Sequence, residues 1–395
     1  MNSMNNVNFL VGSSSYCLKP FEPFSSQVIS FLNIFSKELN TEKIVRNYPD
    51  LKALSFWCRK KNILKMKQNF LSSSNRIGLG LVFHIAPSNI PTNFAYSLIF
   101  GLLSGNSNIV KVPSKNFDQI KIICNIFRKI FKKKKSFIEK KITIIRYNND
   151  DVITKKFSMV CDARLIWGGD KTINDLKSFK THEKNLDIAF ADRYSFCVID
   201  QSKVSKLKDL ELKNLAQKFY NDTFLVDQNA CSSPHLIIWT GKKDIKSRER
   251  FWKSVYNLVK LKYNLTDSAP SEKYNDLCKY ILNLKNIISV QTFENFIYKI
   301  KIKELTKDND SIRGKWGLFF EYETKNIDKV KEFVNNKYQT LTYFGIDKNK
   351  LKDFVFKNNL KGIDRIVPIG QSLNIGLMWD GYNIPTILSR GVEIQ

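Results

Sequence analysis

Long apolar runs are missing from this chain of 395 residues. No stretch of about 18 consecutive apolar residues occurs, so we expect no membrane span. Residues 1–15 are rich in Asn and Ser, and they lack both the basic start and the apolar core of a secretory signal peptide. We therefore expect a cytoplasmic protein. With 43% hydrophobic residues, the chain can bury a sizeable core, as one large domain or as two.

Patterns of metal binding and of disulfide bonding are missing as well. The cysteines number seven, lie far apart in the chain and include no Cys-x-x-Cys pair. This spacing argues against a disulfide framework and against a zinc site. The three histidines, His84, His182 and His235, are too few and too scattered for a convincing metal site. We expect no bound metal.

Acidic residues are scarce relative to basic ones, which leaves a formal net charge of +27. Such a charge can indicate nucleic-acid binding. The lysines, however, are spread over the whole chain, and the one dense run, at 132–135, follows a helical pattern like a solvated connection. We therefore expect no specific nucleic-acid site. A basic surface would equally attract phosphate-bearing cofactors, coenzyme A or an acidic carrier protein.

Short apolar runs bounded by Gly and Pro alternate with helical patterns along most of the chain, after a helical region at 20–70. This alternation is typical of a doubly wound parallel sheet. A second α/β unit is predicted after a boundary near residue 200, with a helix at 327–337 among its elements. Strands are predicted at 80–85, 108–112, 142–145, 163–167, 194–199, 235–239, 288–300, 317–322 and 339–345.

Cys231 lies at the centre of the loop 227–234 (DQNACSSP), between a helical pattern and an apolar strand. Its small neighbours would let a reacting carbonyl group approach the sulfur, and a turn would direct backbone N–H groups to the same point. On local sequence alone, a half-buried cysteine with a packing role is the simpler interpretation.

Gly168 and Gly169 stand between a predicted strand and the start of a predicted helix. The unpaired N–H groups of a first helical turn form a suitable site for a phosphate group. An ordinary β–α turn explains the two glycines equally well. The chain contains neither a Gly-x-Gly-x-x-Gly motif nor a Walker loop.

Several motifs, taken in order, resemble the acyl-CoA reductase (LuxC) family of the aldehyde dehydrogenase superfamily. The resemblance covers residues 77–390 and leaves the first 75 residues uncharacterised. A further stretch, 335–342 (NNKYQTLT), is similar to a strand entry of the wider superfamily. The motifs that carry the family resemblance are 80–91 (GLVFHIAPSNIP), 102–114 (LLSGNSNIVKVPS), 227–234 (DQNACSSP), 362–371 (GIDRIVPIGQ) and 379–381 (WDG).

The resemblance implies an aldehyde dehydrogenase-like α/β fold and the NADPH-dependent reduction of a fatty acyl thioester to an aldehyde. It implies N-terminal helices and an NADP-binding domain at 1–200, completed by 360–395, and a catalytic domain at 201–360. Thioesters of coenzyme A or of a carrier protein are the expected substrates. An acyl-protein synthetase is the expected partner, and a homo-oligomer is the expected assembly.

The resemblance also implies roles for six residues. Cys231 would be the nucleophile that carries the acyl group, and Asn89 would donate its side-chain amide to the oxyanion. The cofactor would be held by Lys111 and Ser114 near the ribose and by Gly168 and Gly169 near the pyrophosphate. One departure is that Val112 separates Lys111 from the following proline.

Oxidative members of the superfamily carry a Glu that activates water, and the matching stretch 187–194 (DIAFADRY) contains no Glu. This absence favours reduction, although Asp187 or Asp192 remains an alternative base. Glu321 loosely resembles a glutamate that holds the cofactor ribose. The alternative functions are an aldehyde dehydrogenase that makes acids, and a basic protein that binds nucleic acid or a membrane surface on an inactive fold. The missing Glu argues against the first alternative, and the intact Asn89 and Cys231 argue against the second.

Overall fold

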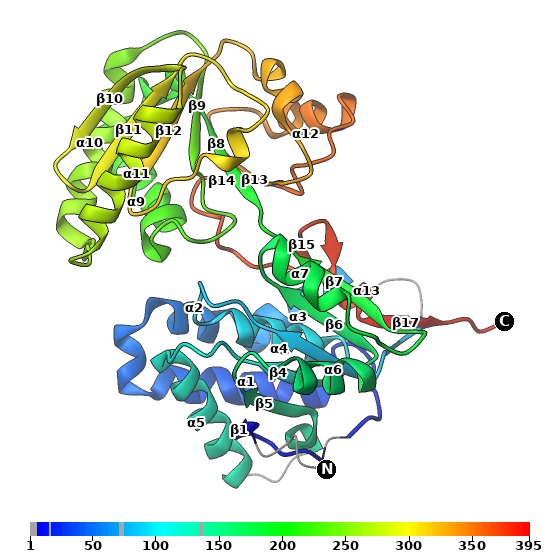
Figure 1. The fold of residues 1–395 in the computed structure, drawn as a ribbon. Helices are drawn as coiled ribbons and strands as arrows, with labels where there is room; N and C mark the ends of the chain where they lie inside the picture. The colour runs from blue at the N-terminus through cyan, green and yellow to red at the C-terminus, as the bar shows by residue number, and fades with distance from the viewer. Residues whose placement is uncertain (1–5, 16, 71–74, 134–136) are drawn as a thin grey trace. The chain divides into compact units, whose positions relative to one another are not determined.

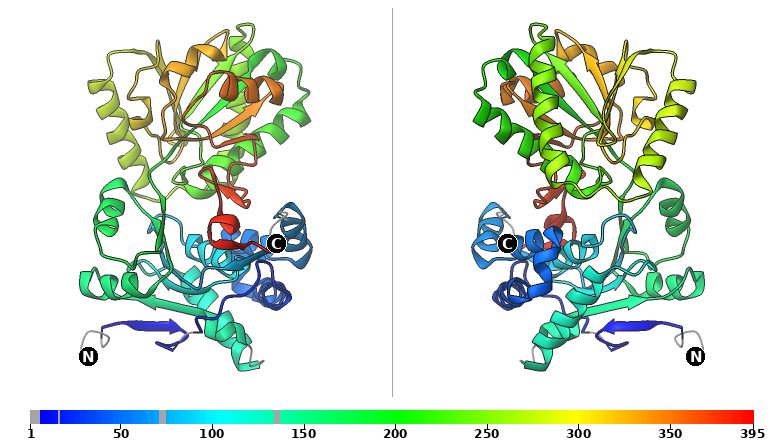
Figure 2. Two further views of the ribbon diagram at one scale, coloured as in Figure 1. Left: turned by 90° about the vertical axis from the view of Figure 1, so that its right-hand side faces the viewer. Right: turned by 90° about the vertical axis from the view of Figure 1, so that its left-hand side faces the viewer.

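The computed structural model describes residues 6–15, 17–70, 75–133 and 137–395, so Lys134 and Lys135 of the lysine run lie outside the described residues. The chain divides into two compact units, Met1–Ala191 with Gly376–Gln395, and Asp192–Ile375. Figures 1 and 2 show that each unit is built from a central sheet with helices packed against it.

The first unit contains a six-stranded sheet in the order β1-β5-β4-β3-β6-β7. All neighbouring strands run parallel except β1, which pairs antiparallel with β5 at one edge. The chain moves outward from β3 through β4 to β5, then crosses back to place β6 on the other side of β3. The strands are β1 (Asn8–Val11), β3 (Leu81–Ile85), β4 (Ser107–Lys111), β5 (Ile142–Arg146), β6 (Ala163–Trp167) and β7 (Leu186–Phe190).

Helices cover this sheet, and side chains from α6 and α7 join the buried residues of β3 in one core cluster. A separate antiparallel pair, β2 (Asn75–Gly78) with β17 (Ser389–Val392), returns the end of the chain to this unit. The remaining elements are α1 (Ser26–Thr41), η2 (Lys43–Asn47), α2 (Pro49–Trp57), α3 (Lys60–Phe70), α4 (Asn93–Leu103), α5 (Asp118–Lys133), η3 (Phe137–Lys141), α6 (Asp151–Val160), α7 (Asp170–Lys177), β15 (Met378–Trp379), β16 (Tyr382–Asn383) and α13 (Ile384–Ile387).

The second unit contains a seven-stranded sheet in the order β10-β11-β12-β9-β8-β13-β14. Only the β10–β11 hairpin at one edge is antiparallel. Its strands are β8 (Tyr194–Asp200), β9 (Leu236–Thr240), β10 (Ile287–Phe293), β11 (Ile297–Ile302), β12 (Leu318–Glu323), β13 (Tyr338–Phe344) and β14 (Arg365–Pro368).

Two hydrophobic clusters fill the two faces of the second sheet, because neighbouring residues of a strand point to opposite faces. On β8, Phe196 and Val198 belong to the cluster shared with α11 and α12, whereas Cys197 and Ile199 belong to the cluster shared with α9 and α10. The helices and turns are α8 (Gln201–Val204), α9 (Asp209–Thr223), η4 (Phe224–Val226), α10 (Ile245–Lys262), α11 (Ala269–Asn283), η5 (Asn309–Ser311), η6 (Ile327–Phe333) and α12 (Lys348–Lys357).

Some predicted elements differ from those in the structure. The expected boundary near residue 200 contrasts with a division before Asp192, because β8 pairs with β9 and β13 of the second unit. The region predicted as strand near 288–300 forms the β10–β11 hairpin, and the helix predicted at 327–337 is the shorter 3-10 helix η6. The short strands β1 and β7 had no clear apolar run and went unpredicted.

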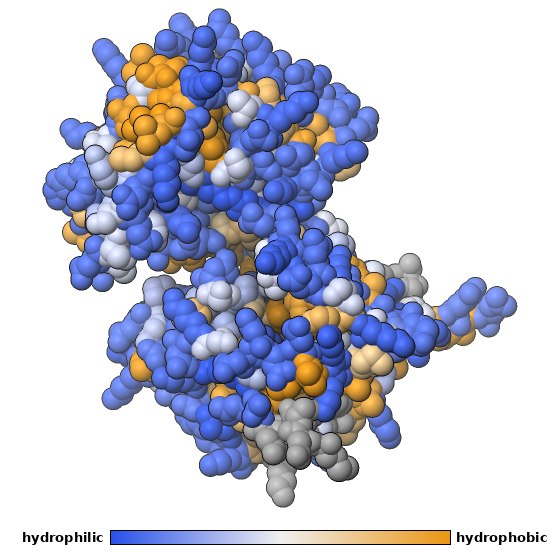
Figure 3. Space-filling model, in the orientation of Figure 1, coloured by the Kyte–Doolittle hydropathy of each residue, from blue (hydrophilic) through white to orange (hydrophobic). Residues whose placement is uncertain are grey.

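The surface is mostly hydrophilic on the face drawn in Figure 3, with several apolar areas, one of which lies where Figure 1 shows β10 and β11. Ile288 on β10 is about half exposed, as expected for an edge strand with one solvated face. Within the described residues, the helices are too short or too polar to cross a lipid bilayer.

Candidate active site

Cys231 lies in a loop of the second unit that two consecutive residues in left-handed backbone conformation introduce. Asp227 has a φ of 52° and Gln228 a φ of 61°. Left-handed geometry is unfavourable for a residue such as Gln unless its surroundings compensate. Here the buried Gln228 side chain donates to the carbonyl oxygens of Pro234 and Leu318, both at 3.1 Å, and accepts from the Gly317 N–H at 3.0 Å. Gln228 thus connects the start of the loop to its end at Pro234 and to the start of β12 at Leu318.

A second anchor comes from Asp222 near the end of α9. Ser233 donates its hydroxyl hydrogen to the Asp222 backbone oxygen at 2.8 Å. The Asp222 carboxylate accepts the N–H groups of Gly370 at 2.6 Å and of Ser372 at 2.9 Å. Burial raises the pKa of Asp222 to about 6, against the opposing effect of these backbone donors. Asp222 therefore connects the tail motif at 362–371 to the Cys231 loop.

Cys231 itself is half-buried and is contacted at both its backbone and its sulfur. The Ser195 hydroxyl donates to the Cys231 carbonyl oxygen at 2.7 Å, and the Gln339 side-chain amide donates to the sulfur at 3.4 Å. Cys124 and Cys161, by contrast, are buried, and burial raises the pKa of each thiol to about 12. The sulfur of Cys231 thus combines partial solvent access with a defined position.

None of the seven cysteines, all of which lie in the described part of the chain, forms a disulfide. Four of them, Cys58, Cys124, Cys161 and Cys197, are buried, and burial raises the pKa of each thiol. Cys17 and Cys278 are half-buried like Cys231.

The residues predicted to hold a cofactor gather at one edge of the first unit's sheet. Lys111 ends β4, Gly168 and Gly169 follow β6, and the loop with Asn89 follows β3. Because β4, β3 and β6 are adjacent and parallel, their carboxyl ends meet at the same edge. The chain reverses its winding direction at β3, and ligands of doubly wound sheets bind in the crevice at such a point. Ser114 lies nearby in sequence, exposed in the loop between β4 and α5.

This edge has features that fit an anionic cofactor. Gly169 is the N-cap of α7, and a Cβ atom added there would meet nothing within 4 Å. Packing therefore does not explain this glycine, which precedes the unpaired N–H groups of the first turn of α7. Lys111 is half-buried with its ammonium group 4.8 Å from the centre of the Tyr147 ring, and burial lowers the pKa of Lys111. Both features suit a dinucleotide phosphate.

The two residues predicted for the chemical step lie in different units. Asn89 belongs to the first unit, where it is exposed in the loop after β3, and Cys231 belongs to the second. Each unit therefore carries its own group of predicted residues, with Asn89, Lys111, Gly168 and Gly169 at one sheet edge.

The two aspartates considered as alternative bases are both ion-paired. Asp187 on β7 accepts two hydrogen bonds from the buried guanidinium of Arg164, at 2.6 and 2.5 Å. Asp192 accepts from Arg313 at 2.8 Å. Both carboxylates are therefore occupied by arginine side chains.

The two buried histidines have structural contacts. His84 bonds the Ser97 hydroxyl at 2.8 Å and the Asn108 side-chain oxygen at 2.9 Å, and it thereby joins α4 to β4 rather than orienting the Asn89 loop. His235 contacts the Gly314 carbonyl oxygen at 3.1 Å. Burial lowers the pKa of His84 to about 4 and that of His235 to about 3, so both imidazoles are neutral at pH 7.

Glu321 does not match the expectation of a ribose-binding residue. Its carboxylate is buried in the second unit and accepts the indole N–H groups of Trp239 at 2.6 Å and Trp252 at 2.8 Å. The Lys299 ammonium lies 3.8 Å from its other oxygen. Glu321 is therefore a polar centre of the hydrophobic core.

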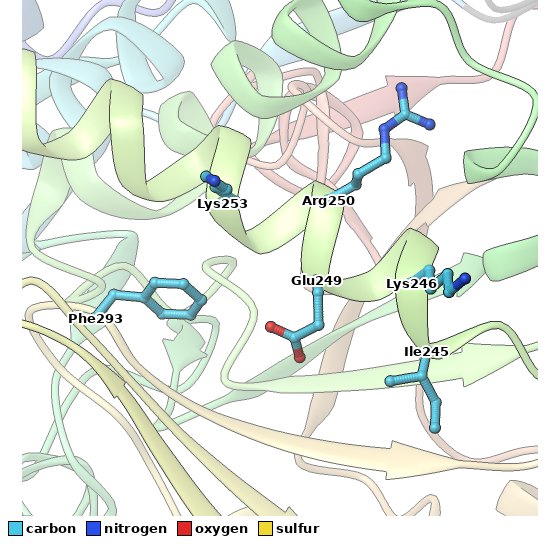
Figure 4. Close-up of a pocket in the computed structure, with 6 residues that line it drawn as sticks. All are labelled: Ile245, Lys246, Glu249, Arg250, Lys253 and Phe293. Carbon is cyan, nitrogen blue, oxygen red and sulfur yellow. The ribbon is translucent and has the colours of Figure 1, made fainter.

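A surface pocket lies elsewhere on the second unit, along α10 and beside the end of β10 (Figure 4). Figure 4 shows Glu249 between α10 and Phe293, and its carboxylate accepts from the buried Lys299 at 3.1 Å. The pocket contains no residue of the predicted site. Its lining consists of Ile245, Lys246, Glu249, Arg250, Lys253 and Phe293.

Sequence reasoning missed four residues that shape the surroundings of Cys231. Gln228 and Gln339 stand inside motifs that we had singled out, and membership of those motifs was the available signal. Ser195 and Asp222 lie in an ordinary strand and an ordinary helix, and no local pattern distinguishes them.

Comparisons with known proteins identify the family and the fold. The family model described as acyl-CoA reductase (LuxC) matches residues 33–280. A long-chain acyl-protein thioester reductase from Vibrio harveyi is 21% identical over 301 residues, which are 74% of this chain and 59% of the relative's length. The chain thus matches less than two thirds of that relative.

Solved structures of aldehyde dehydrogenases share the fold. Aldehyde dehydrogenase 21 from Physcomitrella patens is 13% identical, with a TM-score of 0.60 over 89% of this chain and 79% of that one. Lactaldehyde dehydrogenase from Escherichia coli is 9% identical, with a TM-score of 0.61 over 86% and 78% of the two chains. At these identities the likeness shows the fold alone. The predicted α/β fold of the aldehyde dehydrogenase type is confirmed.

Proposed function

Because this chain belongs to the acyl-CoA reductase (LuxC) family, we propose that it reduces a fatty acyl thioester to an aldehyde through an acyl-cysteine at Cys231. The observation that carries the proposal is the half-buried sulfur of Cys231 in a loop that Gln228 and Ser195 hold in place. A nucleophile needs both an accessible atom and a fixed position. A core cysteine such as Cys197 lacks the access.

In the proposed reaction, the Cys231 thiolate forms a bond to the acyl carbonyl carbon, and the bond from that carbon to the carrier sulfur breaks. The carrier leaves as a thiol after it takes up the proton that Cys231 released. The Cys231 backbone N–H and the amide of Asn89, which the family resemblance assigns to this role, would stabilise the negative oxygen. Bound NADPH would supply the hydride that releases the aldehyde and restores the thiolate.

The cofactor would be held by residues of the first unit. Lys111 and Ser114 are proposed for the ribose, and Gly168 with Gly169 for the pyrophosphate. The open space at Gly169 and the half-buried cation of Lys111 support this assignment. We propose NADPH rather than NADH, because a lysine near the ribose attracts the additional phosphate group of NADPH.

We favour reduction over oxidation to an acid because the stretch 187–194, which matches the position of the Glu in oxidative relatives, contains no Glu. The nearby carboxylates of Asp187 and Asp192 are paired with Arg164 and Arg313. Water activation would also hydrolyse the acyl-cysteine and consume the thioester without reduction.

The substrate class is a long-chain acyl thioester. The curated relative is named for an acyl-protein thioester, so a carrier protein is proposed beside coenzyme A as the group that delivers the acyl chain. An acyl-protein synthetase is the proposed partner. The basic charge of the chain would favour encounter with coenzyme A or an acidic carrier.

The proposal is tested by mixing the protein with a series of acyl-CoA thioesters, first without NADPH. Intact-protein mass spectrometry should detect one acyl group on the wild-type chain and none on Cys231→Ser. With NADPH added, the wild-type chain should oxidise it and form aldehyde, whereas Cys231→Ser should lose more than about a thousandfold of the rate.

The matched control is Cys278→Ser, which replaces another half-buried cysteine on α11 and should leave both readouts unchanged. Full thioester-dependent oxidation of NADPH by Cys231→Ser would overturn the proposed function. Faster turnover of aldehyde with NADP⁺ than of thioester with NADPH, giving acid as product, would favour an aldehyde dehydrogenase instead.

A further inference from the structure

The register between β8 and β13 shifts next to Cys231. Tyr338 pairs with Tyr194 and Leu341 with Phe196, so two residues of β13, Gln339 and Thr340, oppose the single residue Ser195 on β8. This arrangement is a β-bulge. Bulges are frequent beside active sites, where they redirect a side chain that a regular strand would point elsewhere.

The two residues of the bulge are linked to each other. The Thr340 hydroxyl donates to the Gln339 side-chain oxygen at 3.2 Å. In this orientation the oxygen of the amide faces Thr340, and its nitrogen is on the other side. The nitrogen of that amide lies 3.4 Å from the Cys231 sulfur, so an N–H donor faces the thiol. Both bulge residues are fully buried, which limits competition from water.

The same bulge also holds the backbone of Cys231. The Thr340 backbone N–H donates to the Ser195 hydroxyl oxygen at 3.1 Å, and that hydroxyl donates to the Cys231 carbonyl oxygen at 2.7 Å. Two consecutive residues of β13 therefore help to position Cys231. Thr340 acts on its carbonyl group through Ser195, and Gln339 contacts its sulfur. Cys231 as a whole is half-buried rather than buried.

We propose that Gln339 promotes the reactivity of Cys231 by donating a side-chain N–H to its thiolate, with Thr340 fixing the orientation of the amide. The proton released by the thiol passes to solvent or buffer. A hydrogen bond to an ionised group is stronger than one to the neutral form, so the donor favours the thiolate over the thiol. The proposal rests on Cys231 being the nucleophile of the proposed function, although thiol reactivity can be measured without any thioester.

The experiment uses the full chain with Cys17→Ser and Cys278→Ser, so that Cys231 remains as the half-buried thiol among buried ones. The rate of alkylation by iodoacetamide is measured against pH. In this background, Gln339→Leu should slow alkylation at pH 7 about tenfold and move the midpoint of the profile to higher pH by about one unit.

Two further variants separate the donor from packing. Gln339→Glu keeps the size of the side chain but places a negative charge beside the sulfur, so its midpoint should move further than that of Gln339→Leu. Thr340→Val keeps the backbone bond to Ser195 and removes only the hydroxyl that orients the amide. We expect it to slow alkylation about threefold.

The matched control is Gln291→Leu on the exposed edge strand β10, which should leave the profile unchanged. Unchanged profiles in Gln339→Glu and Thr340→Val would overturn the proposal, even if Gln339→Leu failed to fold. If the proposed function were wrong, the result would be different: Cys231→Ser would still oxidise NADPH, whatever the alkylation profile of the Gln339 variants.

Discussion

Trp239 donates its indole N–H to a carboxylate oxygen of Glu321, with 2.6 Å between nitrogen and oxygen, in the core of the second unit. Trp252 donates to the same oxygen at 2.8 Å. Both indole rings are fully buried. Because one carboxylate satisfies two buried donors, Glu321 serves the fold of this unit rather than the binding of a cofactor.

We predict that Glu321→Leu destabilises the second unit by about 2–4 kcal/mol, because two buried indole N–H groups lose their acceptor. Glu321→Gln keeps an acceptor oxygen and should cost less. Urea unfolding followed by tryptophan fluorescence measures both. The dissociation constant for NADPH should match the wild-type value in Glu321→Gln, and a weakened cofactor affinity with unchanged stability would restore the ribose-binding interpretation.

The open space beside Gly169 leads to a second prediction. A Cβ atom added there meets nothing within 4 Å, so Gly169→Val should cost less than about 1 kcal/mol of stability, mainly through a poorer N-cap. Its side chain would occupy the space proposed for the pyrophosphate. We expect about a tenfold weaker affinity for NADPH, measured by fluorescence titration.

Gly376 is the matched control for this variant, since a Cβ atom at that position also meets nothing within 4 Å. Gly376→Val should change neither the unfolding midpoint nor the affinity for NADPH. Equal affinities in the Gly169 and Gly376 variants would exclude Gly169 from the cofactor site.

A third prediction concerns pH. Burial lowers the pKa of His84 to about 4, whereas an unfolded histidine titrates near 6.5. Between these values the unfolded chain binds a proton that the folded unit does not, so stability is fully present above pH 6.5 and is lost as the pH falls. From pH 7 to pH 5 this single group should remove about 2 kcal/mol.

Urea unfolding at the two pH values, followed by circular dichroism, measures this loss. His84→Gln cannot take up the proton, so it should be less stable at pH 7 but lose about 2 kcal/mol less on acidification. An unchanged acid sensitivity in His84→Gln would contradict the prediction.

Much of the fold was predictable from the sequence, because buried parallel strands are continuous apolar runs between Gly and Pro. The run at 80–85 and the helix after it appear in the structure as β3 and α4. The strands β1 and β7 escaped prediction. Each lies at an edge of its sheet, where partial exposure admits polar residues and weakens the apolar signal.

The sequence by itself determined the family and the parallel α/β architecture, since motif order and apolar runs are local properties that a single chain displays, and the family resemblance made Cys231 the predicted nucleophile. Only the tertiary structure decided what surrounds that cysteine. Gln339 reaches it across 108 positions of sequence because a bulge in β13 redirects its side chain. Asp222 and Ser195 each hold the loop through a hydrogen bond, and no repeating pattern in the sequence reveals such a contact. Such contacts depend on which strands become neighbours, and strand order is settled by the packing of the whole sheet.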